Sequence, residues 1–159
     1  MKKKQPSTFI LDVDGVMTTG QFVYSDQGKL FKVFGPHDND GIKMLQKHVA
    51  ILFITADKRG FGITKKRIVD DMGQQLMLVN EYERMEFIEK KYGLKNIAYM
   101  GDGYHDAQIL KACFYGIAPV NARFEAIRSA DFVTPSRSGE GAVLDACLHL
   151  IELFFHREI

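Results

Sequence analysis

The amino-acid sequence predicts an α/β domain built on a parallel β-sheet. Short apolar segments alternate with helix-like segments along the chain, an order that is typical of parallel sheets with helical connections. The segments TFILDV (8–13) and VAILFI (49–54) are apolar at nearly every position, as expected of strands covered by helices on both faces. We therefore expect a single domain over residues 1–159, a length that suits one compact unit.

The elements are expected in a regular order. After the first strand, residues 21–34 alternate around Asp26-Gln27-Gly28, which predicts a β-hairpin inserted at about residues 20–35. Apolar periodicity predicts helices at 40–48, 58–72 and 82–92, and Gly73 and Gly93 are suited to end the last two. Further apolar runs predict strands at 76–79, 97–100, 116–120 and 132–134, and the remaining helices are expected at 106–113, 122–128 and 142–155.

Composition argues against several classes of protein. The formal net charge is only +1, so no basic field suggests a nucleic-acid partner. No segment approaches the ~20 apolar residues of a membrane span, and the first apolar run carries Asp12 and Asp14, unlike a signal peptide. Cys113 and Cys147 are far apart and outside any CxxC pattern, so we interpret them as buried thiols of a cytoplasmic protein.

Acidic residues follow two of the predicted strands at the point where each strand ends. Asp12 and Asp14 close the first strand with Gly15 behind them, and Asp102 follows strand 97–100. Ligands of open parallel sheets bind beyond the carboxyl ends of the strands, and carboxylates this close repel one another unless a cation lies between them. Hard oxygen ligands suit Mg²⁺. A lone loop aspartate would be interpreted as a helix cap, but the repeated pattern favours a magnesium site.

These residues carry a resemblance to the haloacid dehalogenase superfamily of aspartate-nucleophile phosphatases. DVDGV at 12–16 resembles the first motif of that superfamily, and the apolar strand that ends at Thr55 resembles the second. The acidic loop GDGYHD at 101–106 resembles the fourth motif. The segments DVDGVMTTG, HDNDGIKML and SGEGAV resemble a small branch that includes phosphatases of 3-deoxy-octulosonate 8-phosphate and of nine-carbon keto-acid sugar phosphates. The resemblance spans nearly the whole chain, and it implies a Rossmann-like sheet with a projecting hairpin and no cap domain.

The resemblance also implies a role for each matched residue. Asp12 would be the nucleophile that receives the phosphoryl group, and Asp14 would protonate the leaving sugar oxygen and then activate water. Mg²⁺ would be held by Asp12, the carbonyl of Asp14 and Asp102, and it would neutralise charge as phosphate meets the nucleophile. The hydroxyl of Thr55 and the backbone N–H of Ala56 would bind phosphate oxygens.

The third motif of the superfamily, a Lys that pairs with phosphate and nucleophile, has no obvious match. Counting back from Gly93 gives Glu81 at this position, whereas counting forward from strand 76–79 gives Arg84. We favour Arg84, because an anion site needs a cation and a guanidinium binds phosphate in a bidentate fork. The alternative is that Arg84 is a solvated helix charge. The fallback donors would then be Lys58, Lys65 and Lys66.

Several other polar residues have open roles. Asp106 would bind the metal through water or orient its loop. His37 and Arg137 are possible substrate contacts, with an exposed histidine and a loop salt bridge as the respective alternatives. His105 is expected to be an exposed loop residue, with a substrate contact as the alternative.

The resemblance further implies a homotetramer. A capless site would be open to water, and in the branch resembled here the hairpin of one subunit helps to cover the site of the next. The hairpin residues Phe22, Tyr24, Leu30 and Phe31 have no obvious core partner in the sequence, which favours a subunit contact.

Two other interpretations fit parts of the pattern. A phospho-acceptor receiver domain also combines an acidic pair, a Thr and a cation, but here no Asp follows a third strand and Val120-Asn121 stands where its Lys would be. A catalytically impaired oligomerisation module would explain the missing third-motif Lys, although it would not need the acidic motifs and Thr55. The resemblance therefore favours a Mg²⁺-dependent phosphatase that hydrolyses an acidic eight- or nine-carbon keto sugar phosphate through an aspartyl-phosphate intermediate.

Overall fold

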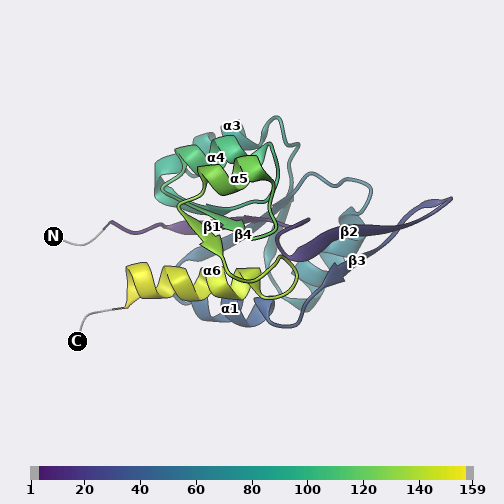
Figure 1. Ribbon diagram of the computed structural model, residues 1–159, viewed down its shortest axis with the longest axis horizontal. Helices are drawn as coiled ribbons and strands as arrows, with labels where there is room; N and C mark the ends of the chain where they lie inside the picture. The colour runs from purple at the N-terminus through teal and green to yellow at the C-terminus, as the bar shows by residue number, and fades with distance from the viewer. Residues whose placement is uncertain (1–3, 157–159) are drawn as a thin grey trace.

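The computed structural model describes residues 4–156 and contains a six-stranded parallel sheet between two layers of helices (Figure 1). This architecture confirms the predicted fold class. Residues 1–3 and 157–159 of the expected domain lie outside the described part. The order across the sheet is β5-β4-β1-β6-β7-β8, and the strands are β1 (Thr8–Asp12), β4 (Ala50–Thr55), β5 (Gln75–Leu78), β6 (Ile97–Met100), β7 (Tyr115–Pro119) and β8 (Phe132–Thr134).

Strand β1 lies at the centre of the sheet, between β4 and β6. In the register of these pairs Asp12 lies beside Ile54 of β4, and Leu11 lies beside Met100 of β6. The residues that follow Ile54 and Met100 therefore reach the same edge of the sheet as Asp12. The chain extends the sheet first on one side of β1 and then on the other, and ligands bind in the crevice at such a reversal of strand order.

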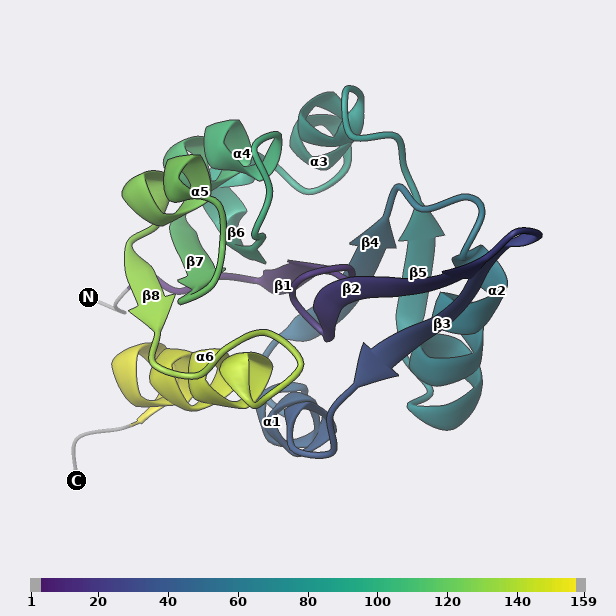
Figure 2. The same ribbon diagram turned by 45° about the vertical axis from the view of Figure 1, so that its right-hand side comes forward.

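The helices form two layers, and each layer encloses its own apolar core (Figures 1 and 2). Alternate residues of β1 point to opposite faces of the sheet: Phe9 and Leu11 pack into one core, and Ile10 packs into the other. The first core is covered by α1 (Asp38–Leu45), by α6 (Ala142–Leu150) and by the turn Lys66–Asp71, which continues α2 (Phe61–Lys65). The second is covered by α3 (Arg84–Lys91), α4 (Asp106–Ala112) and α5 (Phe124–Ser129).

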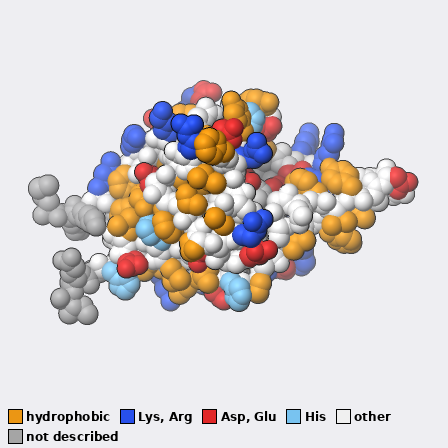
Figure 3. Space-filling view, viewed as in Figure 1, with side chains coloured by type: hydrophobic (Ala, Val, Ile, Leu, Met, Phe, Trp, Pro, Cys, Tyr) orange, Lys and Arg blue, Asp and Glu red, His pale blue; other side chains and the backbone are white. Residues whose placement is uncertain are grey.

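A hairpin of β2 (Thr18–Ser25) and β3 (Gly28–Phe34) leaves the carboxyl end of β1 and projects from the body of the protein (Figure 1). Apolar side chains gather on its surface (Figure 3), and the four residues expected there are all exposed, namely Phe22, Tyr24, Leu30 and Phe31. Lys32, in the middle of β3, is instead buried. The hairpin therefore inverts the usual pattern, with apolar residues outside and a cation inside.

The boundaries of several helices differ from the expected ones. Helix α1 begins at Asp38 rather than at 40, and the buried Asp38 carboxylate accepts hydrogen bonds from the first turn of α6. Helix α3 spans Arg84–Lys91 and so begins two residues later than the helix expected at 82–92. The helices expected over 58–72 and 142–155 change to π-helical turns at Lys66–Asp71 and Ile151–Phe155, a change that apolar periodicity does not distinguish from a continuous α-helix.

Two smaller expectations concern the cysteines and the membrane. Cys113 and Cys147 are both free and buried, as expected. Within residues 4–156 no helix is both long enough and apolar enough to cross a bilayer.

The buried carboxylate of Asp38 ties α1 to α6, and we expect Asp38→Ala to destabilise the fold. Its Oδ1 accepts the backbone N–H groups of Val143 (3.0 Å) and Leu144 (3.2 Å). Leaving two helix-terminal donors unpaired should lower the free energy of unfolding by about 1–3 kcal/mol, measured by urea denaturation. The exposed Asp40→Ala on the same helix is the matched control. Equal stability of the two variants would contradict this role for Asp38.

Candidate active site

A cavity of about 350 Å³ opens at the carboxyl ends of β1 and β4 and beside the loop that follows β6. Its walls come from the loops after these strands, from the start of α3 and from the β2–β3 hairpin. Of the residues predicted from the sequence for the site, it is lined by Asp12, Asp14, Ala56, Arg84 and Asp106. The cavity thus lies at the reversal of strand order around β1.

The loop after β1 is folded by its own hydrogen bonds. The carbonyl of Val13 accepts the N–H groups of three residues, Val16, Met17 and Thr18. The Thr18 hydroxyl accepts the N–H of Gly15 (3.0 Å) and that of Gly20 (3.1 Å). Gly15 has a positive φ of 80°, a conformation that a side chain rarely adopts. The sequence DVDGVMTTG therefore makes a tight turn that holds Asp12 and Asp14 at the cavity.

Three carboxylates form an acidic cluster in this crevice. Asp12, Asp102 and Asp106 each offer one oxygen, and these oxygens lie within 4.8 Å of one another. Burial raises the pKa of Asp12 well above its usual range, and the charges of Asp106 and Asp102 add to this effect while Arg84 opposes it. Burial and the charge of Asp106 likewise raise the pKa of Asp102 to about 7. Oxygen ligands crowded in this way fit a hard divalent cation, whose charge would relieve their repulsion.

Asp106 is held by four donors. Its Oδ2 accepts the N–H groups of Asp102 (3.1 Å) and Gly103 (2.8 Å), and its Oδ1 accepts the Tyr99 hydroxyl (2.5 Å) and Arg84 Nη1 (3.1 Å). A carboxylate with both oxygens already engaged is suited to shape a loop. Of the two roles considered for Asp106, these contacts favour the orientation of the loop that carries Asp102.

Arg84 reaches the centre of the site from the first residue of α3. Its Nη1 lies 3.3 Å from Oδ1 of Asp12 and 3.1 Å from Oδ1 of Asp106, and it donates to the Tyr99 hydroxyl at 3.2 Å. The side chain is only 5% exposed, so its charge acts in a medium that screens poorly. A solvated helix charge is therefore not an adequate description of Arg84.

Thr55 and Ala56 occupy the end of β4 beside the cavity. The Thr55 side chain is fully buried, and its Oγ1 accepts the N–H of Asp57 (3.1 Å). This bond uses a lone pair of the hydroxyl and leaves its proton for another acceptor. Ala56 lines the cavity, whereas Thr55 is not among the lining residues.

Three charged residues of the site were not found by sequence reasoning. Lys32 Nζ lies 2.8 Å from Asp14 Oδ1 and 2.8 Å from Asp57 Oδ2, and Lys29 Nζ lies 2.7 Å from the same Asp57 oxygen. Burial by itself would raise the pKa of Asp57. Hydrogen bonds from Lys29, Lys32 and the N–H of Gly60 instead lower this pKa to about 2. Both lysines belong to β3, so this hairpin contributes to the site of its own chain. Lys32 is the one buried residue of β3, and this position is the signal that identifies it.

Other expected residues lie elsewhere. His37 and Arg137 are exposed and do not line the cavity, so a substrate would have to extend beyond the cavity to touch them. Arg137 faces Glu140 at 4.0 Å, which fits the loop salt bridge considered for it. The fallback donors Lys65 and Lys66 pair with Asp70 and Asp71 on the surface. His105, expected to be exposed, is instead half-buried in the cavity wall, between the rings of Tyr82 and Tyr104.

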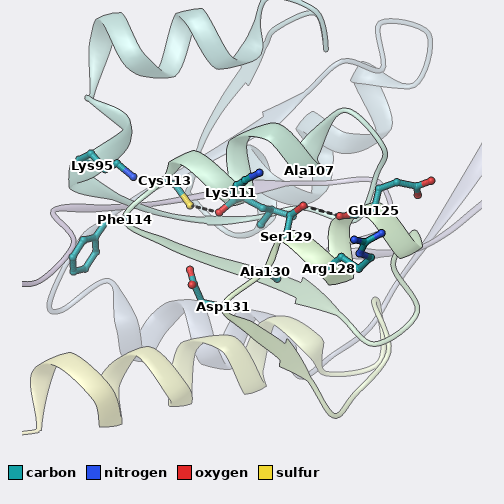
Figure 4. Close-up of a pocket in the computed structure, with 11 residues that line it drawn as sticks. Lys95, Ala107, Lys111, Cys113, Phe114, Glu125, Arg128, Ser129, Ala130 and Asp131 are labelled. Carbon is teal, nitrogen blue, oxygen red and sulfur yellow. Dashed lines mark hydrogen bonds between the residues drawn. The ribbon is translucent and has the colours of Figure 1, made fainter.

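A second and larger cavity, of about 660 Å³, lies at the opposite, amino-terminal ends of the strands (Figure 4). Lys95, Cys113 and Asp131, which help to line it, precede β6, β7 and β8 respectively. Ligand sites of parallel sheets lie at the other ends of the strands. The smaller cavity is lined by Asp12, Asp14, Asp106, Arg84 and Lys29, and we therefore assign the chemistry to that one.

Comparison with known proteins agrees with this geometry. The profile of the haloacid dehalogenase-like hydrolases matches residues 79–146. The 3-deoxy-D-manno-octulosonate 8-phosphate phosphatase of Haemophilus influenzae is 33% identical over 141 residues, which are 84% of this chain and 76% of that protein. The enzyme of the same name from Salmonella typhi is 29% identical over 148 residues, 87% of this chain and 75% of that protein.

Solved structures show the same fold. The cobalt-bound phosphatase of this kind from Haemophilus influenzae has a TM-score of 0.80 at 26% identity, with 94% of this chain and 89% of that chain covered. The enzyme from Moraxella catarrhalis, in complex with magnesium, phosphate and KDO, has a TM-score of 0.81 at 25% identity, with coverages of 94% and 87%. The chain belongs to the haloacid dehalogenase superfamily. Within it, the chain is a KdsC-like phosphatase, an enzyme that hydrolyses phosphate monoesters.

Gly15 leaves space that Asp102 needs, and we expect Gly15→Ala to damage the acidic cluster. A Cβ at this position would lie 2.0 Å from Asp102 Oδ2, so the carboxylate must move. A displacement of about 1 Å in such a site typically lowers turnover about 10²-fold, and stabilisation of the protein by divalent metal, measured as a thermal shift, should be lost as well.

Gly73→Ala is the matched control for the Gly15 variant. Gly73 also has a positive φ, but a Cβ there would meet nothing within 4 Å. Both variants carry the backbone strain, and only the Gly15 variant disturbs Asp102. Equal loss of metal response in both would contradict the steric explanation.

Proposed function

We propose that this protein is a Mg²⁺-dependent phosphatase of an acidic eight- or nine-carbon keto sugar phosphate, acting through an aspartyl-phosphate on Asp12. The observation that carries the proposal is the position of Asp12, at the reversal of strand order and 3.3 Å from a buried guanidinium. A phosphate group that enters the cavity meets this carboxylate with Arg84 beside it. Asp14 lies in the same wall, two residues further along the loop.

The proposed reaction has two steps. In the first, an Asp12 oxygen attacks phosphorus, the bond to the sugar oxygen breaks, and Asp14 gives its proton to that oxygen. In the second, Asp14 removes a proton from water, and the water oxygen attacks phosphorus and releases phosphate from Asp12. Each proton that Asp14 gives is thus regained, and the enzyme returns to its starting state. Arg84, Thr55 and the N–H of Ala56 are proposed to bind the phosphate oxygens.

Magnesium is proposed as the metal. The side chains of Asp12 and Asp102 and the carbonyl of Asp14 would hold it, while Asp106 orients the loop or contacts the metal through water. When bound, the ion would neutralise part of the negative charge shared by phosphate and nucleophile. Support comes from the cluster of carboxylate oxygens within 4.8 Å and from the magnesium ion in the Moraxella catarrhalis structure.

The sugar class is suggested by relatives and by the cavity. The relatives named above act on 3-deoxy-D-manno-octulosonate 8-phosphate, and a nonulosonate 9-phosphate has the same combination of an acid end and a phosphate end. The cavity presents Lys29, Asp57 and His105 beside the reaction centre, and such charged and polar groups suit a substrate rich in hydroxyl groups and bearing a carboxylate.

A catalytically impaired module was the main alternative, because the third-motif Lys was missing. The guanidinium of Arg84, 3.3 Å from Asp12, supplies a cation at that point. This contact argues against the alternative. The two unpaired, buried cysteines support a reducing, cytoplasmic location as part of the proposal.

A homotetramer is also part of the proposal. Exposed apolar side chains cluster on the hairpin, including Tyr24 (57% exposed) and Phe31 (63% exposed), and clusters of this kind commonly mark protein interfaces. The hairpin would then serve two sites, its own chain through Lys29 and Lys32 and a neighbouring chain through its apolar surface.

We expect phosphate release from an eight- or nine-carbon keto-acid sugar phosphate, with simple hexose phosphates as poorer substrates in the same panel. Chelation of the metal should abolish release, and Asp12→Asn should lower turnover on the order of 10³-fold or more because the nucleophile is lost. Asp40→Asn, on the exposed side of α1, is the control. A folded, magnesium-loaded protein that releases no phosphate from any ester would overturn the proposed function.

We expect a solution mass of four times the 18.1 kDa chain mass, measured by light scattering at micromolar concentration. Phe31→Glu should dissociate this assembly, because it places a charge in the proposed apolar contact. Phe124→Glu changes a side chain of nearly equal exposure (65%) on α5 and is the matched control. A wild-type protein of monomer mass would contradict the assembly.

A further inference from the structure

Lys32 is a buried cation that the reaction outlined above does not use. Its side chain is 0% exposed, and its Nζ lies 2.8 Å from Asp14 Oδ1, 2.8 Å from Asp57 Oδ2 and 2.7 Å from Thr64 Oγ1. An ammonium has three N–H donors, and here three oxygen atoms surround it. Removing such a charge from water is unfavourable unless these partners compensate for it. The position of Nζ is therefore tightly defined.

Asp14 depends on this contact for its direction. It lies on a loop rather than on a helix or strand, and its side chain is 20% exposed in the cavity wall. The ammonium of Lys32 occupies the side of Oδ1. The second oxygen, Oδ2, is then the one left to exchange a proton with a group in the cavity.

Lys32 is in turn held in place by the loop after β4. Asp57 accepts the ammonium groups of both Lys32 and Lys29, and its other oxygen accepts the N–H of Gly60 (3.1 Å). Lys29 Nζ also lies over the ring of Phe22, 3.5 Å from its centre. The hairpin is thereby attached to the loop that follows Thr55, so the positions of Lys32 and of the phosphate-binding segment are linked.

Lys32 is not placed to bind substrate. Lys29, Asp57 and Phe22 line the cavity, whereas Lys32 does not. Its charge faces Asp14 from behind the wall. A lysine that bound phosphate would need an exposed ammonium, and Lys32 has none.

We propose that Lys32 is a positioning residue, which holds Asp14 so that its free oxygen faces the leaving oxygen of the substrate, with Asp57 and Thr64 as its anchors. The proposal rests on the proposed function, because it assigns Lys32 to the acid step performed by Asp14. It makes the hairpin part of the catalytic machinery of its own chain. The loss of rate in a Lys32 variant should therefore be larger for an ester whose leaving group needs a proton than for one whose leaving group does not.

Two esters separate this effect from a general loss of structure. An alkyl ester such as a sugar phosphate leaves as a strongly basic alkoxide and needs the proton of Asp14. The nitrophenolate of p-nitrophenyl phosphate leaves as a stable anion and does not need it. Lys32→Met should lower kcat for the alkyl ester about 10²-fold, the lower range of acid–base contributions, with little change in KM. The burst of nitrophenolate release in the first turnover, which reports attack by Asp12, should change less than about threefold.

Two further variants complete the test. Lys43→Met removes an exposed ammonium on α1 that does not line the cavity, and the ratio of the two rates should stay near that of the wild type. Lys32→Arg keeps a cation and should recover part of the alkyl-ester rate, and it also serves if Lys32→Met does not fold. Equal losses on both esters in either Lys32 variant, or no loss in Lys32→Met, would overturn the proposal.

A measurement without turnover separates this proposal from the proposed function. The ammonium of Lys32, which donates to Thr64 and forms ion pairs with Asp14 and Asp57, should give a ¹⁵N–¹H signal that persists in the folded protein, and Asp14→Asn should shift it. Persistence and shift with no phosphatase activity would overturn the proposed function while leaving the Lys32–Asp14 contact in place. A signal that exchanges as fast as that of exposed Lys43, or that ignores Asp14→Asn, would overturn the contact itself.

Discussion

The central constraint on this structure is the repulsion among carboxylates gathered at one edge of the sheet. Asp12, Asp102 and Asp106 bring oxygens within 4.8 Å of one another, and Asp14 and Asp57 line the same cavity. In a partly buried place such a cluster is stable only with nearby positive charge or bound protons. Burial raises the pKa values of Asp12 and Asp102, and the charge of Asp106 adds to this effect at both residues. The elements around the sheet are arranged to supply cations at this point.

Two elements supply those cations from opposite directions. Helix α3 begins at Arg84, so that its first side chain reaches Asp12 and Asp106. The hairpin brings Lys29 and Lys32 to Asp57 and Asp14 from outside the sheet. Arg84 therefore compensates the charges of Asp12 and Asp106, while the lysines compensate those of Asp14 and Asp57 on the other side of the cavity. A divalent metal would complete the compensation where the carboxylate oxygens lie closest.

The sequence predicted the sheet, the placement of its acidic loops and Arg84 as a candidate cation, because each depends on a local pattern. Apolar runs define the strands, and the residue after each run must lie at the sheet edge. Lys29 and Lys32 escaped prediction because their partners are distant in the sequence: Lys32 meets Asp14 and Asp57 only after the hairpin folds back over the sheet. Asp57 follows Thr55 by two residues, and without the lysines nothing in the local pattern distinguishes it from an ordinary turn residue. The π-helical turns at 66–71 and 151–155 escaped for a different reason, since their apolar pattern matches that of an α-helix.

In the proposed enzyme, the hairpin would join catalysis and assembly in one element. In β3 the exposed Phe31 and Val33 flank the buried Lys32, so a surface that packs against Phe31 would press on the strand that carries the partner of Asp14. An apolar surface exposed to water gains stability when it is covered, whereas the ammonium of Lys32 is already satisfied within the chain. Covering the hairpin would thus restrict its motion without disturbing the ion pairs beneath it. Within residues 4–156 no cap domain covers the site, and a hairpin held between its own chain and a neighbour would be a physical means of keeping Asp14 in place.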